Sequence, residues 1–137
     1  MVIKVKLTGH CNCGGVSYSF DGQPALTAVC HCKACQRQTG SYASLVVGVQ
    51  DPELKVLGET LGTFITQGDS GQPVHRSFCT RCGSPIVSRC DSIPGLAFIK
   101  AGTLDDTSEL NPTAELYLDD AQAWTARLGV TCYAKGM

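Results

Sequence analysis

The chain has 137 residues, a formal net charge of −1 at pH 7 and a hydrophobic fraction of 43%. This length suits one domain over residues 1–137 with a buried core, and the balanced charge argues against disorder and against a broad nucleic-acid-binding surface. No apolar run approaches the ~18 residues of a membrane span, and the N-terminus lacks the apolar block of a signal peptide. We therefore expect a cytoplasmic protein that binds neither nucleic acid nor membrane.

Short apolar segments separated by glycines predict a mainly β fold with little helix. The first two alternate apolar with polar side chains, over residues 3–7 and 16–20, and Asp21-Gly22 then indicates a turn. Further strands are predicted at residues 43–49, 54–57, 63–66, 74–78, 85–88 and 96–101. Ala34–Gln38 is compatible with one helical turn that Gly40 ends, and residues 119–128 with a helix or an irregular C-terminal segment.

Nine cysteines are the outlier of the composition. In a secreted protein they would suggest disulfides, whereas in a reducing compartment closely spaced thiols indicate metal ligands. The odd count, the missing export signal and the grouping of most thiols into Cys-x-Cys, Cys-x-Cys-x-x-Cys and Cys-x-x-Cys together favour metal. Cys90 and Cys132 stand alone, and we expect both to be small buried hydrophobic residues.

Two cysteine pairs have the spacing of zinc half-sites. Cys11 and Cys13 would point to one side of an extended strand, and Cys79 and Cys82 would be brought together by a tight turn. Each pair supplies half of a tetrahedron, so the two together would close a structural zinc site across a long loop. Such a site contributes ~10–16 kcal/mol in small zinc domains, enough to rival the net stability of a domain.

The middle cluster holds three thiols, Cys30, Cys32 and Cys35, without a fourth nearby. With the other pairs matched, a zinc here would have three protein ligands and an open position for water, for His31 or a distant histidine, or for an incoming thiol. Three thiolates make the metal a weak Lewis acid that suits activation of a soft ligand such as a substrate thiol. We therefore predict Cys30, Cys32 and Cys35 as the catalytic residues, and two zinc ions per chain.

Spacing alone leaves other divisions of the ligands open. Cys30 and Cys32 could instead pair with Cys79 and Cys82, and both zinc sites could be purely structural, which is the commoner case for zinc modules. The unmatched third thiol of the middle cluster is the feature that favours a reactive site.

Three motifs resemble the glutathione-dependent formaldehyde-activating enzyme family, which includes the centromere protein V-like proteins. They are Gly-His-Cys-Asn-Cys-Gly-Gly at 9–15, Val-Cys-His-Cys-Lys-Ala-Cys-Gln-Arg-Gln-Thr-Gly at 29–40 and Phe-Cys-Thr-Arg-Cys-Gly-Ser-Pro-Ile at 78–86. Ala-Gly-Thr-Leu-Asp-Asp at 101–106 and Asn-Pro-Thr-Ala-Glu-Leu-Tyr at 111–117 are similar to its C-terminal signature. The resemblance implies an Mss4-like β-tent of several short antiparallel sheets held together by zinc. It also implies a structural zinc at residues 11, 13, 79 and 82, a catalytic zinc at 30, 32 and 35, and condensation of glutathione with formaldehyde.

Several other residues have both a functional and an ordinary structural interpretation. His31 could bind metal or carry a proton, but as a strand neighbour of two ligands it should point away from them, as a surface or core histidine. Lys33, Arg37 and Arg76 could receive glutathione carboxylates, although solvated surface charge is the commoner explanation for such residues and is favoured for each. Trp124 is expected in the core or an interface.

Two hypotheses about function follow. The first is a carbon–sulfur lyase-type enzyme that activates a small thiol, glutathione in particular, toward formaldehyde or a similar electrophile. The second is a non-catalytic zinc module that binds a protein partner. A nucleic-acid binder is disfavoured by the balanced charge.

Overall fold

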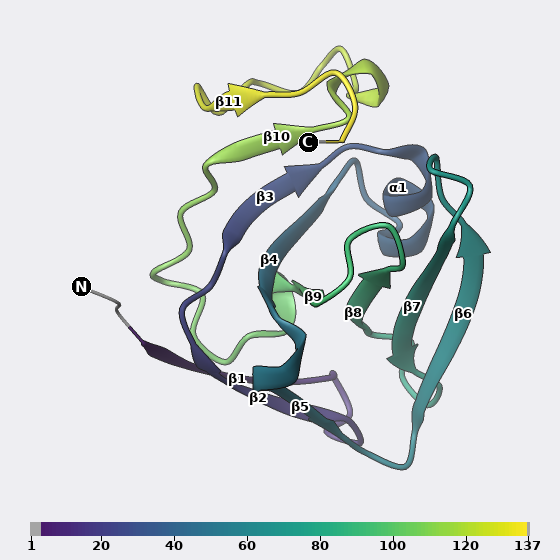
Figure 1. The fold of residues 1–137 in the computed structure, drawn as a ribbon, viewed down its shortest axis with the longest axis vertical. Coiled ribbons are helices and arrows are strands. Elements are labelled where there is room, and N and C mark those ends of the chain that lie inside the picture. Colours follow the sequence, from purple (N-terminus) through teal and green to yellow (C-terminus); the bar gives the residue numbers. More distant parts are fainter. Residues whose placement is uncertain (1–3, 137) are drawn as a thin grey trace.

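The computed structural model describes residues 4–136, and within them the strands form two sheets. The smaller sheet is antiparallel and has the order β1 (Val5–His10), β2 (Ser17–Gly22) and β5 (Leu54–Leu57). It lies at the bottom of the view in Figure 1, below a larger, curved sheet.

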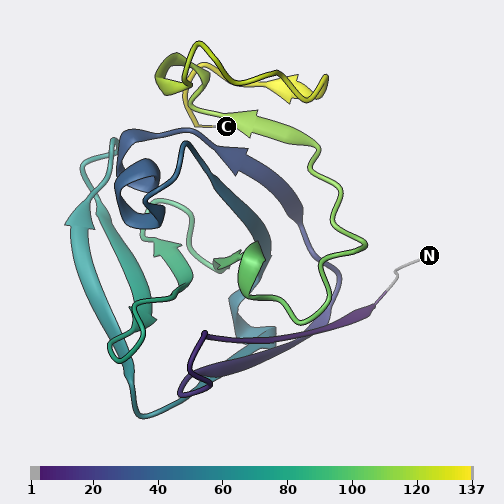
Figure 2. The same ribbon diagram turned by 180° about the vertical axis from the view of Figure 1, so that it is seen from behind.

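The larger sheet has eight strands in the order β11-β10-β3-β4-β9-β8-β7-β6. In chain order these are β3 (Leu26–Cys30), β4 (Ser44–Gln50), β6 (Leu61–Gln67), β7 (Pro73–Cys79), β8 (Pro85–Cys90), β9 (Leu96–Lys100), β10 (Ala114–Leu116) and β11 (Thr131–Cys132). The short helix α1 (Lys33–Thr39) lies near the upper ends of β6 and β7 in both views (Figures 1 and 2). The 3₁₀ turns are η1 (Asp51–Glu53), η2 (Ala101–Thr103) and η3 (Leu118–Asp120).

The prediction of a mainly β fold with little helix is confirmed. Helix α1 includes the predicted turn at Ala34–Gln38, and Gly40 ends it in the left-handed conformation at φ 64°. A residue without a Cβ adopts that conformation with little strain, which is why the helix stops there. Among the described residues, no helix is long and apolar enough to cross a membrane.

The smaller sheet is antiparallel, as expected, whereas the larger sheet is mixed. Strand β10 runs parallel to β3 on one side and to β11 on the other. None of these three strands was predicted. Strands β10 and β11 have three and two residues, too few to show periodicity, and β10 pairs with a distant strand, with Ala114 opposite Ala28.

Asp21 and Gly22 do not form the predicted turn. Both belong to β2, where they pair with Lys6 and Val5 of β1. Strand β1 is long enough to continue the ladder through these positions, so tertiary pairing overrides the local turn preference. The predicted strand at residues 3–7 corresponds to β1, except that residue 3 lies outside the described residues.

The two faces of the larger sheet have different surroundings. Val47 and Ile99 point into the main core, which fills the space between the two sheets, and burying one such side chain contributes ~1.5–3 kcal/mol. Because alternate residues of a strand point to opposite faces, Val46 and its partner Lys100 lie on the other face. Cys30 pairs with Ser44 at the end of that same face.

One long connection ties the larger sheet to the smaller one. After η2, Leu104 forms a bridge with Gly9 of β1, and the Asp105 amide donates a hydrogen bond of 2.9 Å to the Thr8 carbonyl. Figure 2 shows this segment descending toward the smaller sheet and then rising to β10. It positions β10 beside the end of β3, where the middle cysteine cluster begins.

Candidate metal centres

The first cluster joins the turn after β1 to the turn after β7. Cys11 and Cys13 lie in the turn between β1 and β2, while Cys79 ends β7 and Cys82 lies in the turn before β8. The four sulfurs lie within 4.8 Å of one another, although Cys13 and Cys79 are 66 positions apart. This is the group of four thiols that the sequence predicts.

Tight turns, rather than a strand, direct the first pair of sulfurs. The Gly14 amide donates to the Cys11 carbonyl at 3.1 Å, and the Gly83 amide to the Cys79 carbonyl at 2.8 Å. Both glycines have φ near 80°, which a residue with a Cβ rarely adopts. The predicted extended Cys-x-Cys segment is therefore wrong in its local structure, yet both half-sites still present two sulfurs to one point.

The sulfur spacing in this cluster fits a tetrahedral zinc ion. The Cys13 sulfur lies 3.6 Å from the sulfurs of both Cys11 and Cys79. A zinc ion with Zn–S bonds of 2.3 Å would place its four sulfurs about 3.8 Å apart. All four cysteines are free thiols, so these distances do not reflect disulfides.

Hydrogen-bond donors surround the four sulfurs. They are the backbone amides of Val16 and Gly15, the hydroxyls of Thr60 and Ser84, and the guanidinium of Arg81, at 3.2–3.4 Å. The Thr60 hydroxyl lowers the pKa of Cys79, and the Ser84 side chain and backbone lower the pKa of Cys82 to about 5. These contacts favour the thiolate, which is the form that binds metal.

The second cluster forms where β3 meets α1. Cys30 is the last residue of β3, Cys32 caps α1, and Cys35 lies in its first turn, as the sequence predicts. The three sulfurs lie within 4.8 Å of one another, and the Cys35 amide donates to the Cys32 sulfur at 3.3 Å. No fourth cysteine, histidine or carboxylate of residues 4–136 joins this group.

Two cationic side chains approach the second cluster. The Arg76 Nη1 atom lies 4.0 Å from the Cys35 sulfur and donates to the Gln38 side chain at 3.1 Å. The Lys100 Nζ atom donates to the Ser44 hydroxyl at 3.0 Å, and its residue is only 5% exposed. Hydrogen bonds from Cys30 and Cys32, together with the charges of Lys100 and Arg76, hold the pKa of Cys35 far below its usual range.

Sequence reasoning named Arg76 as a candidate contact but missed Lys100. One signal was present, since a lysine ends the otherwise apolar segment Leu96–Lys100, where a core strand would be expected to stay apolar. Lys33 and Arg37, the other two predicted contacts, are exposed on α1. The Thr39 hydroxyl donates to the Cys35 carbonyl at 2.8 Å and so shapes the end of the helix.

His31 points away from the three sulfurs and into the protein interior. It is 1% exposed, and its Nε2–H group donates to the Glu115 carboxylate at 2.9 Å. Its Nδ1 atom has no partner among the described residues. This agrees with the interpretation of a core histidine, but its partner Glu115 was not foreseen, because 84 positions separate the two residues.

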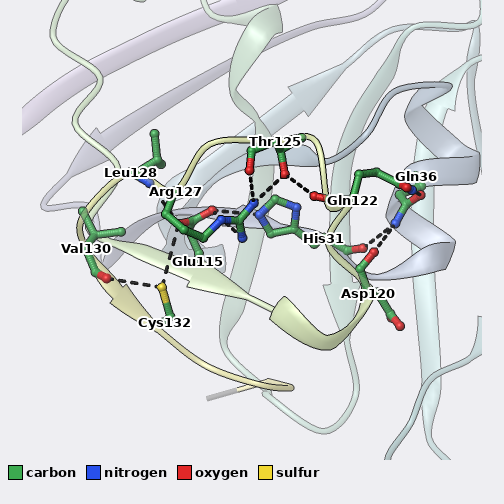
Figure 3. A network of polar contacts seen from close by, with 10 residues as sticks. All are labelled: His31, Gln36, Glu115, Asp120, Gln122, Thr125, Arg127, Leu128, Val130 and Cys132. Atoms are coloured by element: carbon green, nitrogen blue, oxygen red, sulfur yellow. Dashed lines mark hydrogen bonds and ion pairs between the residues drawn. The ribbon is translucent and has the colours of Figure 1, made fainter.

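Glu115 belongs to a polar network that holds the C-terminal segment against the second cluster (Figure 3). Its carboxylate accepts a hydrogen bond of 3.1 Å from the Leu128 amide and pairs with Arg127 at 3.4 Å. Gln36 of α1 donates to the carbonyls of His31 at 2.8 Å and of Asp120 at 3.1 Å. Residues 117–136 are therefore anchored to both elements that carry the three thiols.

Three remaining predictions can be compared with the structure. Cys132 is exposed and Cys90 is half-buried, so the expectation that both are buried fails for Cys132. Its strand, β11, has two residues and lies at the outer edge of the sheet. Trp124 is 74% exposed and packs edge-to-face on Tyr42 at 5.7 Å, so it is not a core residue. Residues 119–128 are irregular after η3 rather than helical.

Comparison with known proteins decides the family. The model of the family described as "Glutathione-dependent formaldehyde-activating enzyme" matches residues 6–120. The chain belongs to this family. The formaldehyde-activating family match covers both cysteine clusters, whereas a comparison with curated proteins finds no match.

A solved structure supports the fold of this formaldehyde-activating family member. A Rhodobacter sphaeroides protein of known crystal structure is similar, with a TM-score of 0.57 and 21% sequence identity. The similarity covers 77% of this chain and 91% of that protein. At this level of identity the likeness concerns the fold and carries no information about the reaction.

Proposed function

We propose that this chain is a zinc-dependent enzyme of the carbon–sulfur lyase type that joins a small thiol, glutathione in particular, to formaldehyde or a similar electrophile. Membership of the formaldehyde-activating family supports the reaction class. The observation that carries the proposal is the unequal division of the thiols, four in one cluster and three in the other. Two zinc ions per chain would then have different roles.

The seven cysteines are the proposed ligands. Cys11, Cys13, Cys79 and Cys82 would hold a structural zinc, and Cys30, Cys32 and Cys35 a catalytic one. Zinc in the second cluster would offer an open coordination position and favour the thiolate form of an entering thiol. In the reaction, the thiol sulfur bonds to the carbonyl carbon, the C=O π electrons move to oxygen, and that oxygen gains the proton that the thiol loses. Cleavage of the same C–S bond is the reverse reaction.

Replacing Cys35 by serine tests this function. We expect Cys35→Ser to remain folded, because the four-thiol cluster is intact, but to bind fewer than two zinc ions and to lose condensation of glutathione with formaldehyde. Zinc content by elemental analysis and adduct formation by NMR would be measured. Cys132→Ser is the matched control, because Cys132 is exposed and lies outside both clusters. Full turnover in Cys35→Ser would overturn the mechanism.

A second candidate function is a zinc module that binds a protein partner. The outer strand β6 favours it, because its sequence Leu-Gly-Thr-Phe-Ile-Thr-Gln has no charge and exposes Phe64 by 63% and Ile65 by 58%. Uncharged edge strands readily pair with another chain. Zinc-edge X-ray absorption separates the two functions, since the enzyme should exchange a ligand when glutathione is added and the module should not.

We also propose that the protein works in a reducing, cytoplasmic compartment. The support is chemical, because all nine cysteines are free and seven of them must stay reduced to bind zinc. The proposed partner is a small thiol.

A further inference from the structure

The three-thiol cluster shares one face of the larger sheet with two cations that have no carboxylate partner. Lys100 on β9 and Arg76 on β7 both direct their charge to this face, beside Cys30 and Cys35. Among residues 4–136, no Asp or Glu forms an ion pair with either of them. The negative charges that act on Lys100 are those of the Cys35, Cys30 and Cys32 thiolates.

Burial of the Lys100 ammonium group costs free energy that its surroundings must offset. Its residue is 5% exposed, and its one hydrogen-bond partner, the Ser44 hydroxyl, is neutral. A buried ammonium group destabilises a protein unless an anion or several hydrogen bonds compensate it. Burial lowers the pKa of Lys100, while the thiolate charge of Cys35 acts in the opposite direction. The thiolate charges therefore offset part of the cost of burying the ammonium group.

The charges of the site point to an anionic ligand. Three thiolates around a divalent zinc leave one excess negative charge, which Lys100 alone would balance. Arg76 then adds a positive charge, with its Nη1 atom 4.0 Å from the Cys35 sulfur. A fourth ligand with one negative charge, such as a thiolate, would make the site neutral, whereas a neutral ligand would leave a cation uncompensated.

Further groups face the same space. Ser88 of β8 lies between Arg76 and Phe98 in the sheet, is 6% exposed, and its hydroxyl has no partner among the described residues. It can therefore hydrogen-bond a polar atom of a ligand. Titratable groups near the cluster include His31, Cys90 with Asp91 beside it, and Tyr117 with Asp69. Burial, Asp69 and the thiolates raise the pKa of Tyr117 to about 12.

We propose that Lys100 and Arg76 form a cationic pair that stabilises the thiolate form of the substrate thiol beside the three-cysteine cluster. This inference rests on the proposed function and assigns the two residues a positioning role in it. In the step concerned, the S–H bond breaks, its electron pair stays on sulfur, and the proton passes to solvent. The positive charges favour the product of that ionisation, so the thiol binds as its anion at a lower pH.

Thiol binding to the cobalt-substituted protein tests the role without a measurement of turnover. The probe is 2-mercaptoethanol, which has no carboxylate, and binding is followed by sulfur-to-cobalt charge-transfer absorbance over a range of pH. In Lys100→Met and Arg76→Met, we expect the apparent pKa of binding to rise by about one unit, which weakens binding about tenfold near pH 7. Lys100→Arg should bind the thiol with a pH profile close to that of the wild-type protein, because it keeps the positive charge.

Control variants accompany the test, and failure of the inference can be distinguished from failure of the proposed function. Lys33→Met and Arg37→Met remove exposed charges of α1 and should leave the pH profile unchanged. Wild-type profiles in both Lys100→Met and Arg76→Met would overturn the inference but leave the proposed function standing. Should Lys100→Met fail to fold, the partly exposed Arg76 gives the deciding variant. If the unaltered protein binds no thiol at any pH, the proposed function itself fails.

Discussion

The two cysteine clusters differ most in what surrounds the sulfurs. Hydroxyls, backbone amides and one exposed arginine donate to the four-thiol cluster at 3.2–3.4 Å. The three-thiol cluster has one backbone amide at 3.3 Å and two cations, one of them buried. Hydrogen bonds therefore dominate the surroundings of the four-thiol cluster, and positive charges dominate those of the three-thiol cluster.

Under the proposed function, this difference would separate a structural from a reactive metal centre. Hydrogen bonds around a closed set of ligands orient them and hold the metal, and they leave no room for a further ligand. Surplus positive charge beside an incomplete set of ligands instead favours the arrival of an anion. The same residue type can therefore serve two purposes in one chain, according to the number of thiols and the charge of their neighbours.

Removal of one thiol from each cluster is the strongest test of this comparison. Cys79→Ser breaks a centre that links residues 66 positions apart, and zinc binding contributes ~10–16 kcal/mol in small zinc domains, so we expect the variant to unfold. Circular dichroism with thermal melting would measure this, beside the folded Cys35→Ser variant.

The comparison would fail in either of two cases. One is a Cys79→Ser variant that melts like the wild-type protein, and the other is a Cys35→Ser variant that unfolds as completely as Cys79→Ser. Cys132→Ser again serves as the control, because its thiol belongs to neither cluster.

Glu115→Gln tests whether the C-terminal segment supports only the second cluster. The change removes the charge that faces His31 and Arg127 but keeps the shape, and a buried charged hydrogen bond of this kind contributes ~1.5–3 kcal/mol. We expect faster amide hydrogen exchange in residues 117–136 and weaker zinc binding at the second cluster, with the first unaffected. Equal loss of both zinc ions would contradict the separation of the two centres.

The stability of the wild-type protein at low pH should depend on the charge of the Glu115 carboxylate. Burial alone would raise the pKa of Glu115, but the His31 hydrogen bond, the Leu128 amide and the Arg127 charge lower it below its ordinary 4.5. A depressed pKa means that the stabilisation is complete above about pH 4.5 and is lost as the pH falls through the folded-state value. Glu115→Gln should lack this part of the pH dependence.

Local patterns in the sequence were enough to predict both clusters, and long-range contacts account for what was missed. The Cys-x-Cys and Cys-x-x-Cys spacings are read within a few residues, so the grouping of seven thiols into four and three could be proposed before the fold was known. Strand β10 and the pair His31–Glu115 depend on contacts between residues 84 positions or more apart, which leave no periodic signal.

Lys100 shows a further limit of sequence reasoning. Its position in strand β9 was predicted, but only the pairing of Lys100 with Val46 shows that its side chain faces the cysteines rather than the main core. A one-residue change of register would place it on the opposite face. Strand predictions therefore locate such a residue along the chain without deciding which site it serves.

Of the variants proposed, Arg81→Met should change stability and thiol binding least. The Arg81 Nε atom donates to the Cys13 sulfur at 3.2 Å, but both residues are exposed to solvent, which screens the interaction. We expect at most a slight decrease in the free energy of unfolding, measured with denaturant, and no change in thiol binding at the second cluster. Arg76→Met should show the reverse pattern, with a clear change in thiol binding. If Arg81→Met shifted the pH profile of thiol binding as much as Arg76→Met, a general effect of net charge would explain both, and the local role of Arg76 would be refuted.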